Sequence, residues 1–271
     1  MVDLFQYSLE NAQDIDKFDL ECSFVCAKLS ALAYESRSIQ TKFLSSYGFT
    51  DTKVLIKRKS NVTLTRFNNI IFIAFMGTDF NNINDLVDNV RMIWSNEGSG
   101  KVHAGYKDHV DLFWTDIKNY IQSVPHEQII VTGHSMGGAC GQIVNNRLPN
   151  TIGYYFGSTR CVDSVIQKSS SSTIFQLRHK YDVVAHFPLR VFGFCRLGET
   201  LVIKNAVIVS KTPRWYDMAY SLLYTLIYFI MVGITKATGT KSHLINKVLI
   251  NHQIDGYIKN IENVVKITNQ Q

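Results

Sequence analysis

Apolar runs and segments of helical period alternate along the chain. Residues 70–75 read IIFIAF, a continuous apolar run typical of a strand buried on both faces of a sheet. Residues 128–132 form a second short apolar strand, and the small residues at 137–146 predict a helix directly behind it. Further strands are predicted over 151–156 and 173–177. Strands that alternate with helices in this way predict an α/β fold.

The outer segments add two hairpins and several helices. Residues 54–58 and 62–67 alternate between polar and apolar positions, and Ser60 with Asn61 suggests the turn between them. The remaining predictions are a second hairpin of 201–203 and 206–209, and helices over 23–33, 84–92, 108–124, 245–250 and 254–265.

Composition places the chain among folded globular proteins. Of 271 residues, 46% are hydrophobic and 18% are charged, which argues against disorder and predicts one domain over residues 1–271. The net charge of +6 would suit an anionic partner. Its densest basic run, residues 53–58, is typical of a solvated strand face, so nucleic-acid binding is not predicted.

The cysteines and the N-terminal residues bear on metals and compartment. Five cysteines, an odd number, include no C-x-x-C pair: Cys22, Cys26, Cys140, Cys161 and Cys195. Residues 1–16 are acidic and lack the apolar core of a secretory signal, so we expect an intracellular, cytoplasmic protein with reduced thiols. No acidic loop suggests calcium, and we expect neither a metal nor a cofactor.

The strongest chemical motif is G-x-S-x-G at residues 133–137. An apolar strand leads into it and a helix with small residues follows. A serine on such a tight turn is held in a strained backbone conformation, and the flanking glycines avoid clashes with the neighbouring chain. The helix N-terminus favours negative charge beside the hydroxyl. Ser135 is therefore the candidate nucleophile.

Five ordered segments resemble the class 3 lipases, the family of fungal triacylglycerol lipases and plant phospholipase A1-like enzymes. They are FMGT (75–78), VHAGY (102–106), GHSMGGA (133–139), YFGSTR (155–160) and DVVAHFP (182–188). Residues 192–205 also look like the family's segment after its catalytic aspartate, so the resemblance covers roughly 20–260. It implies an α/β-hydrolase fold, a mostly parallel sheet with helices on both faces, in which Ser135 attacks a carboxylic ester to form an acyl-enzyme.

The triad order of these hydrolases, Ser then Asp then His, narrows the partners of Ser135. Asp182 directly follows an apolar strand, where the family places its acid. Asp163 is the alternative, although its place after YFGSTR favours a surface loop. We therefore expect Asp182 to orient the base.

Three histidines follow the candidate acid. His186 lies only four residues after Asp182, too close for an independently placed base. His252 begins HQIDGY, which resembles the pattern around the family's catalytic histidine, whereas His243 precedes a predicted helix. His252 is the favoured base, and His243 is the alternative.

The resemblance also implies an oxyanion hole. Its donors are the backbone N–H of Met136 and the N–H and hydroxyl of Thr78. Met76 departs from the family, which usually has Arg there, and this leaves the anchoring of a lid open. His103 and His134 are typical of the family and are expected to pack near the nucleophile without a chemical role.

Two further segments suggest contact with lipid. Residues 79–94 occupy the family's lid position as an amphipathic segment, with an ordinary surface helix as the alternative. Residues 218–235 carry no charge and span about 27 Å as a helix, just short of a bilayer core. A single crossing would put Asp182 and His252 on opposite sides of the bilayer, which argues against a span if both belong to the triad. Three alternatives stay open: a helix or hairpin buried in the domain, an interfacial helix, and a true span in which the resemblance does not hold. We expect peripheral membrane association.

The sequence thus predicts a serine hydrolase acting on lipid esters, of the triacylglycerol lipase or phospholipase A1 type. The alternatives are a soluble short-chain esterase or thioesterase with the same triad, and an inactive hydrolase fold that binds lipid. Neither the lipid class nor the oligomeric state follows from the sequence.

Overall fold

The computed structural model describes residues 3–12, 17–78, 93–204, 207–210, 223, 226 and 250–269. Several predictions fall outside these residues. They are residues 79–92 of the predicted lid (79–94), most of the apolar segment (218–235), the predicted helix over 84–92, nearly all of that over 245–250, and His243. Within the described ranges, no helix is both long and apolar enough to cross a membrane.

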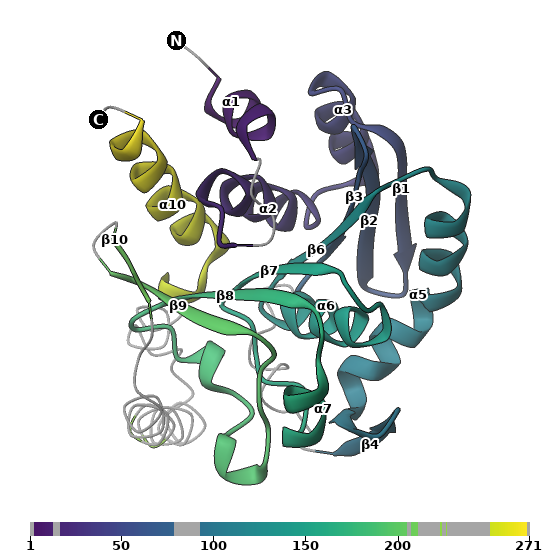
Figure 1. Cartoon of the computed structure of the whole chain (residues 1–271), viewed down its shortest axis with the longest axis vertical. Coiled ribbons are helices and arrows are strands. Elements are labelled where there is room, and N and C mark those ends of the chain that lie inside the picture. Colours follow the sequence, from purple (N-terminus) through teal and green to yellow (C-terminus); the bar gives the residue numbers. More distant parts are fainter. Residues whose placement is uncertain are drawn as a thin grey trace, which may run out of the picture.

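An eight-stranded sheet forms the centre of the molecule, in the order β1-β2-β3-β6-β7-β8-β9-β10 (Figure 1). Strands β3 to β9 pair in parallel, while β1-β2-β3 at one edge and β9-β10 at the other are antiparallel. The strands are β1 (Thr50–Lys57), β2 (Ser60–Phe67), β3 (Ile70–Phe75), β6 (Gln128–His134), β7 (Ile152–Phe156), β8 (Thr173–His179), β9 (Glu199–Lys204) and β10 (Val207–Ser210). A separate two-stranded sheet pairs β4 (Trp94–Glu97) with β5 (Gly100–His103).

Helices cover both faces of this sheet. One face carries α1 (Leu4–Asn11), α2 (Leu20–Leu32), α3 (Arg37–Ser46) and α10 (Ile254–Thr268). The other carries α5 (Ala104–Ser123), α6 (Met136–Arg147) and α7 (Ser164–Ser169). The predicted mostly parallel sheet with helices on both faces is thereby confirmed.

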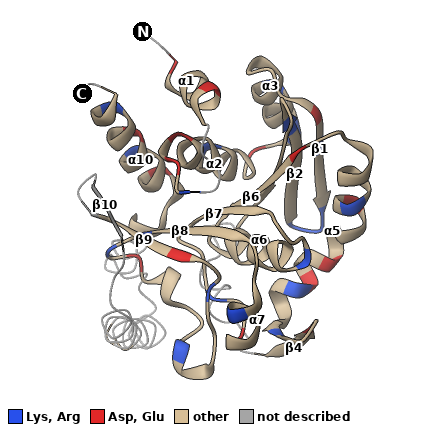
Figure 2. Ribbon diagram, in the orientation of Figure 1, with Lys and Arg blue, Asp and Glu red and all other residues tan. Residues whose placement is uncertain are grey.

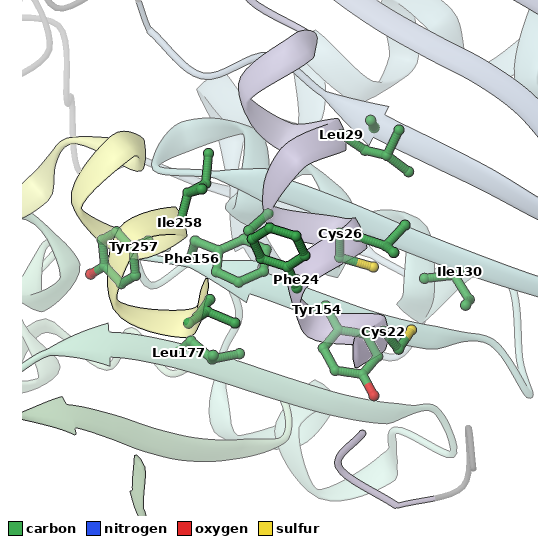
Figure 3. Packing of buried hydrophobic residues seen from close by; sticks show 14 of the residues in the cluster. Cys22, Phe24, Cys26, Leu29, Ile130, Tyr154, Phe156, Leu177, Tyr257 and Ile258 are labelled. Carbon is green, nitrogen blue, oxygen red and sulfur yellow. The ribbon is translucent and has the colours of Figure 1, made fainter. Parts of the chain in front are cut away.

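Helices α2 and α10 pack together against the middle strands. Figure 3 shows side chains of α2 and α10 meeting those of β6, β7 and β8. They include Cys22, Phe24, Cys26 and Leu29 of α2, Tyr257 and Ile258 of α10, and Ile130, Tyr154, Phe156 and Leu177 of the strands. This packing fixes the start of α10, which begins two residues after His252.

Local rules explain most elements and a few differences from prediction. The Asp19 carboxylate accepts the Cys22 N–H at 2.6 Å and so caps α2. In the first hairpin Lys57 pairs with Ser60, so the turn lies at residues 58–59, and the prediction of a turn at Ser60 and Asn61 was wrong. The short helices α1, α3 and α7 and the small sheet were not predicted.

Candidate active site

The candidate nucleophile, Ser135, lies between β6 and the first turn of α6. Its backbone has φ 57° and ψ −127°, a left-handed conformation that is strained for a serine. A Cβ on Gly133 would lie 2.5 Å from the Gly137 carbonyl carbon, and one on Gly137 would clash with the Phe75 and Met76 carbonyls. Both glycines therefore let three backbone segments approach closely. The motif predicted this strand-to-helix turn, and the structure has it.

A continuous set of hydrogen bonds links Ser135, His252 and Asp182. His252 Nε2 lies 2.9 Å from Ser135 Oγ, and His252 Nδ1 lies 2.9 and 2.8 Å from the two Asp182 carboxylate oxygens. All three residues are buried. Because Nδ1–H donates to the carboxylate, the neutral ring presents its lone pair on Nε2 to the serine hydroxyl.

Besides His252, two groups hold the Asp182 carboxylate. The Tyr257 hydroxyl donates to Oδ2 at 2.6 Å, and the Ala185 N–H donates to Oδ1 at 3.2 Å. Burial by itself raises the pKa of Asp182, but the interaction with His252 and the hydrogen bonds outweigh it and lower this pKa to about 2. Asp182 is therefore ionised at neutral pH.

Gly157 leaves room for the aspartate and the histidine to meet. It follows β7 with φ 55°, and its N–H donates to the Leu177 carbonyl at 2.9 Å. A Cβ here would lie 2.6 Å from Asp182 Oδ2 and 3.0 Å from His252 Nδ1. A side chain at this position is thus excluded by space and disfavoured by backbone conformation.

The predicted oxyanion donors belong to Met136 and Thr78. Met136 opens α6, so its N–H belongs to the first turn, whose amides have no acceptor within the helix. Thr78 follows β3, and its Oγ1 lies 3.4 Å from Met136 Sδ, which places the two predicted donor residues next to each other. The start of α6 carries no charged side chain, because the charged residue of this helix, Arg147, lies at its far end (Figure 2). The backbone amides at the helix start are therefore not neutralised by a side chain of α6 itself.

The other candidates lie elsewhere or act differently. Asp163 caps α7, where its Oδ1 accepts the Val165 and Ile166 N–H groups at 3.0 and 2.9 Å. His186 is buried beside Arg178, away from the serine–histidine contact. His103 stacks on Tyr106 at 4.1 Å between ring centroids.

Two tyrosines near the site escaped prediction as site residues. Tyr257 belongs to the HQIDGY segment, but its pattern gave no sign that it touches the acid. Tyr34 lies 100 residues before His134, which its hydroxyl contacts at 3.0 Å. No local sequence signal points to Tyr34. Within the described residues, no cluster of His, Cys, Asp or Glu is arranged to hold a metal ion.

Comparison with known proteins bears on this geometry. Residues 72–192 match the sequence model of a family described as lipase (class 3). This stretch is therefore similar in sequence to the class 3 lipases. The matched stretch contains Thr78, Ser135 and Asp182, whereas His252 lies beyond it.

Lipases from fungi resemble the chain in sequence and in fold. The lipases of Rhizopus niveus and Rhizopus oryzae are each 30% identical over 153 residues, which cover 50% of this chain and 39% of the relative. The chain therefore matches well under half of the length of these curated relatives.

Solved structures show the likeness in fold. A lipase from Rhizopus microsporus var. chinensis has a TM-score of 0.53 at 20% identity, with 77% of each chain covered. A mutant form of MDLA from Penicillium cyclopium has a TM-score of 0.61 at 15% identity, covering 74% of this chain and 90% of its own. The chain thus has the fold of these fungal lipases, the α/β-hydrolase fold.

Proposed function

We propose that the protein is a serine hydrolase that cleaves carboxylic ester bonds of lipids. The observation that carries the proposal is the unbroken chain from Ser135 Oγ through the His252 ring to the Asp182 carboxylate, with contacts of 2.8–2.9 Å. The class 3 lipase sequence over residues 72–192 supports an ester as the substrate. Ser135 is the nucleophile, His252 the general base and Asp182 the residue that orients it.

In the first half of the reaction, Ser135 Oγ bonds to the ester carbonyl carbon while its proton passes to His252 Nε2. The negative charge that develops on the carbonyl oxygen is stabilised by N–H donors of Met136 and Thr78 and by the start of α6. The intermediate then expels the alcohol, which takes the proton from His252. An acyl-enzyme on Ser135 results.

Water completes the cycle. It attacks the acyl carbon and gives a proton to His252, which returns it to Ser135 as the fatty acid leaves. Throughout, Asp182 stabilises the imidazolium form of His252, and its low pKa of about 2 keeps it ionised for this role.

Hydrolysis of p-nitrophenyl esters of graded chain length, with and without detergent micelles, tests the proposal. We expect Ser135→Ala and His252→Ala each to lower kcat/KM by about 10⁶-fold, because triad members act as a unit. His243→Ala is the matched control and is expected to keep wild-type activity. If His243→Ala abolishes hydrolysis and His252→Ala does not, the assignment of the base is wrong.

The chain-length profile separates a lipase from a soluble esterase. A lipase prefers long acyl chains and gains activity at the micelle surface, whereas an esterase or thioesterase prefers short dissolved substrates. If the folded wild type hydrolyses no ester but binds lipid, the proposed activity fails and an inactive lipid-binding role replaces it.

The proposal includes contact with a lipid surface through residues 218–235. Its support is the sequence. An uncharged, tyrosine-containing segment is flanked by Arg214, Asp217 and Lys236, and the net positive charge of the flanks, with Lys211 nearby, suits an anionic headgroup boundary. We expect the protein to sediment with vesicles of phosphatidylcholine and phosphatidylserine more than with phosphatidylcholine alone. Equal or absent sedimentation with both would contradict this contact.

A further inference from the structure

A second series of hydrogen bonds ends at the backbone carbonyl of His252 rather than at its ring. Tyr34 lies just after α2, and its hydroxyl is 3.0 Å from His134 Nδ1. On the other side of the same ring, His134 Nε2 is 2.6 Å from the carbonyl oxygen of His252. The His134 and His252 rings also contact each other, with centroids 4.7 Å apart. His134 thus lies between Tyr34 and the proposed base.

The acceptor at one end fixes the direction of these hydrogen bonds. A carbonyl oxygen only accepts, so His134 Nε2 carries the hydrogen and donates to His252. Nδ1 of the neutral ring then has the lone pair, and the Tyr34 hydroxyl donates to it. Burial, together with the nearby His252, lowers the pKa of His134 to about 3, so the ring is neutral at physiological pH.

The Tyr34 hydroxyl also lies against the predicted oxyanion loop. A Cβ added to Gly77 would clash with the hydroxyl oxygen of Tyr34 and would lie 2.6 Å from the His134 carbonyl oxygen and 3.3 Å from Ser135 Cβ. Gly77 immediately precedes Thr78. The Tyr34 hydroxyl therefore contacts both His134 and the backbone at Gly77, next to the predicted oxyanion donor.

We infer that Tyr34 and His134 are positioning residues of the site, an inference that rests on the proposed function. Through His134, Tyr34 holds the backbone carbonyl of His252. It thereby helps to fix the position of His252 Nε2, which lies 2.9 Å from Ser135 Oγ. Through its contact with Gly77, the same hydroxyl keeps the approach to Thr78 in register with the nucleophile. Neither side chain touches the reacting atoms.

Tyr34→Phe tests this role because it removes only the hydroxyl. We expect kcat on p-nitrophenyl butyrate to fall about 10-fold with KM unchanged, as one hydrogen bond that orients the base is lost. Tyr47→Phe is the matched control: Tyr47 is also half-buried, and its hydroxyl donates to Asp3 at 2.6 Å, on α1 and away from the site. We expect it to leave kcat unchanged.

A double-mutant cycle with His134→Phe tests the coupling. If Tyr34 acts through His134, Tyr34→Phe has little further effect on kcat in the His134→Phe background. Fully multiplicative losses would overturn the inference. Should His134→Phe fail to fold, Tyr34→Phe against Tyr47→Phe still decides the role of the hydroxyl.

The experiments distinguish failure of the positioning role of Tyr34 from failure of the proposed hydrolase function. If wild type and Tyr47→Phe hydrolyse esters and Tyr34→Phe has the same kcat as they do, only the positioning role is wrong. If the folded wild type hydrolyses no ester at all, the proposed function fails and this role fails with it. A kcat loss in Tyr34→Phe, with a melting temperature matching Tyr47→Phe, supports both.

Discussion

Backbone packing holds the nucleophile, whereas side-chain hydrogen bonds hold the acid and base. Ser135 is fixed by its own strained turn and by glycines that let neighbouring backbone approach. Asp182 and His252 come from separate loops, 70 residues apart, and are joined by hydrogen bonds that also involve Tyr257. The first arrangement is local and rigid; the second depends on groups brought together only by the complete fold. Substitutions at the Ser135 turn and substitutions around Asp182 and His252 should therefore have different effects on activity and stability.

After the loss of Ser135 or His252, the largest expected effect separates the two candidate acids. Asp182→Asn should lower kcat/KM by about 10³- to 10⁴-fold with the fold intact, because an amide does not hold the His252 tautomer as a carboxylate does. Asp163→Asn should weaken the cap of α7 while leaving kcat/KM unchanged. Ester hydrolysis and circular dichroism of both variants check this, and a larger kinetic loss in Asp163→Asn would reverse the assignment.

Gly157→Ala should disturb the acid and the base, whose atoms lie nearest to the new Cβ. The new Cβ would press on the Asp182 carboxylate, 2.6 Å away, and Gly157 has φ 55°. A misplacement near 1 Å costs about 100-fold in rate, which is the loss of kcat/KM we expect. Gly105→Ala is the control, because the closest atom to its new Cβ is 3.4 Å away.

Tyr257→Phe should have a smaller effect confined to the acid. It removes the 2.6 Å hydrogen bond to Asp182 and the acceptor of the His179 N–H, so we expect kcat/KM to fall about 10-fold. Tyr154→Phe is matched, since Tyr154 is equally buried and its hydroxyl accepts the Asp19 N–H at 3.1 Å. Equal kinetic losses in both variants would show that Tyr257 acts through stability alone.

The smallest expected effect concerns stability and pH. The pKa of His134 is about 3 in the folded protein, against an ordinary value of 6.5. Between these values the unfolded chain binds the proton and the folded chain does not, so the free energy of unfolding falls as pH falls from 6.5 toward 3. The contribution is at most about 1.4 kcal/mol per pH unit.

Urea unfolding at several pH values measures this dependence. His134→Phe should show a shallower decline of the free energy of unfolding than the wild type over that window. His109 and His179, whose pKa values are also lowered by burial, keep part of the slope in both proteins. Identical slopes would mean that His134 is not held neutral.

Features that depend on adjacent residues were predictable from the sequence, whereas contacts between distant residues were harder to predict. The apolar run of β3 and the glycine-flanked Ser135 were readable because strand burial and the tight turn depend on adjacent residues. Short helices such as α1 and α7 have too few residues to show a clear period. Their ends depend on single caps, such as Asp163 for α7.

The base and its supports were harder to predict because they are distant in sequence. His252 lies 117 residues from Ser135, so spacing alone left His243 open. Tyr34 and Tyr257 contact the site through hydroxyl groups that no local motif requires. Only the packing of α2 and α10 on the central strands brings these residues to the nucleophile (Figure 3).

Covalent labelling with a fluorophosphonate, located by mass spectrometry, tests most directly whether Ser135 is an activated nucleophile. We predict one adduct, on Ser135, absent in Ser135→Ala, formed far more slowly in His252→Ala and at the wild-type rate in His243→Ala. No adduct on the folded wild type, or an adduct on another residue, would contradict the proposed hydrolase.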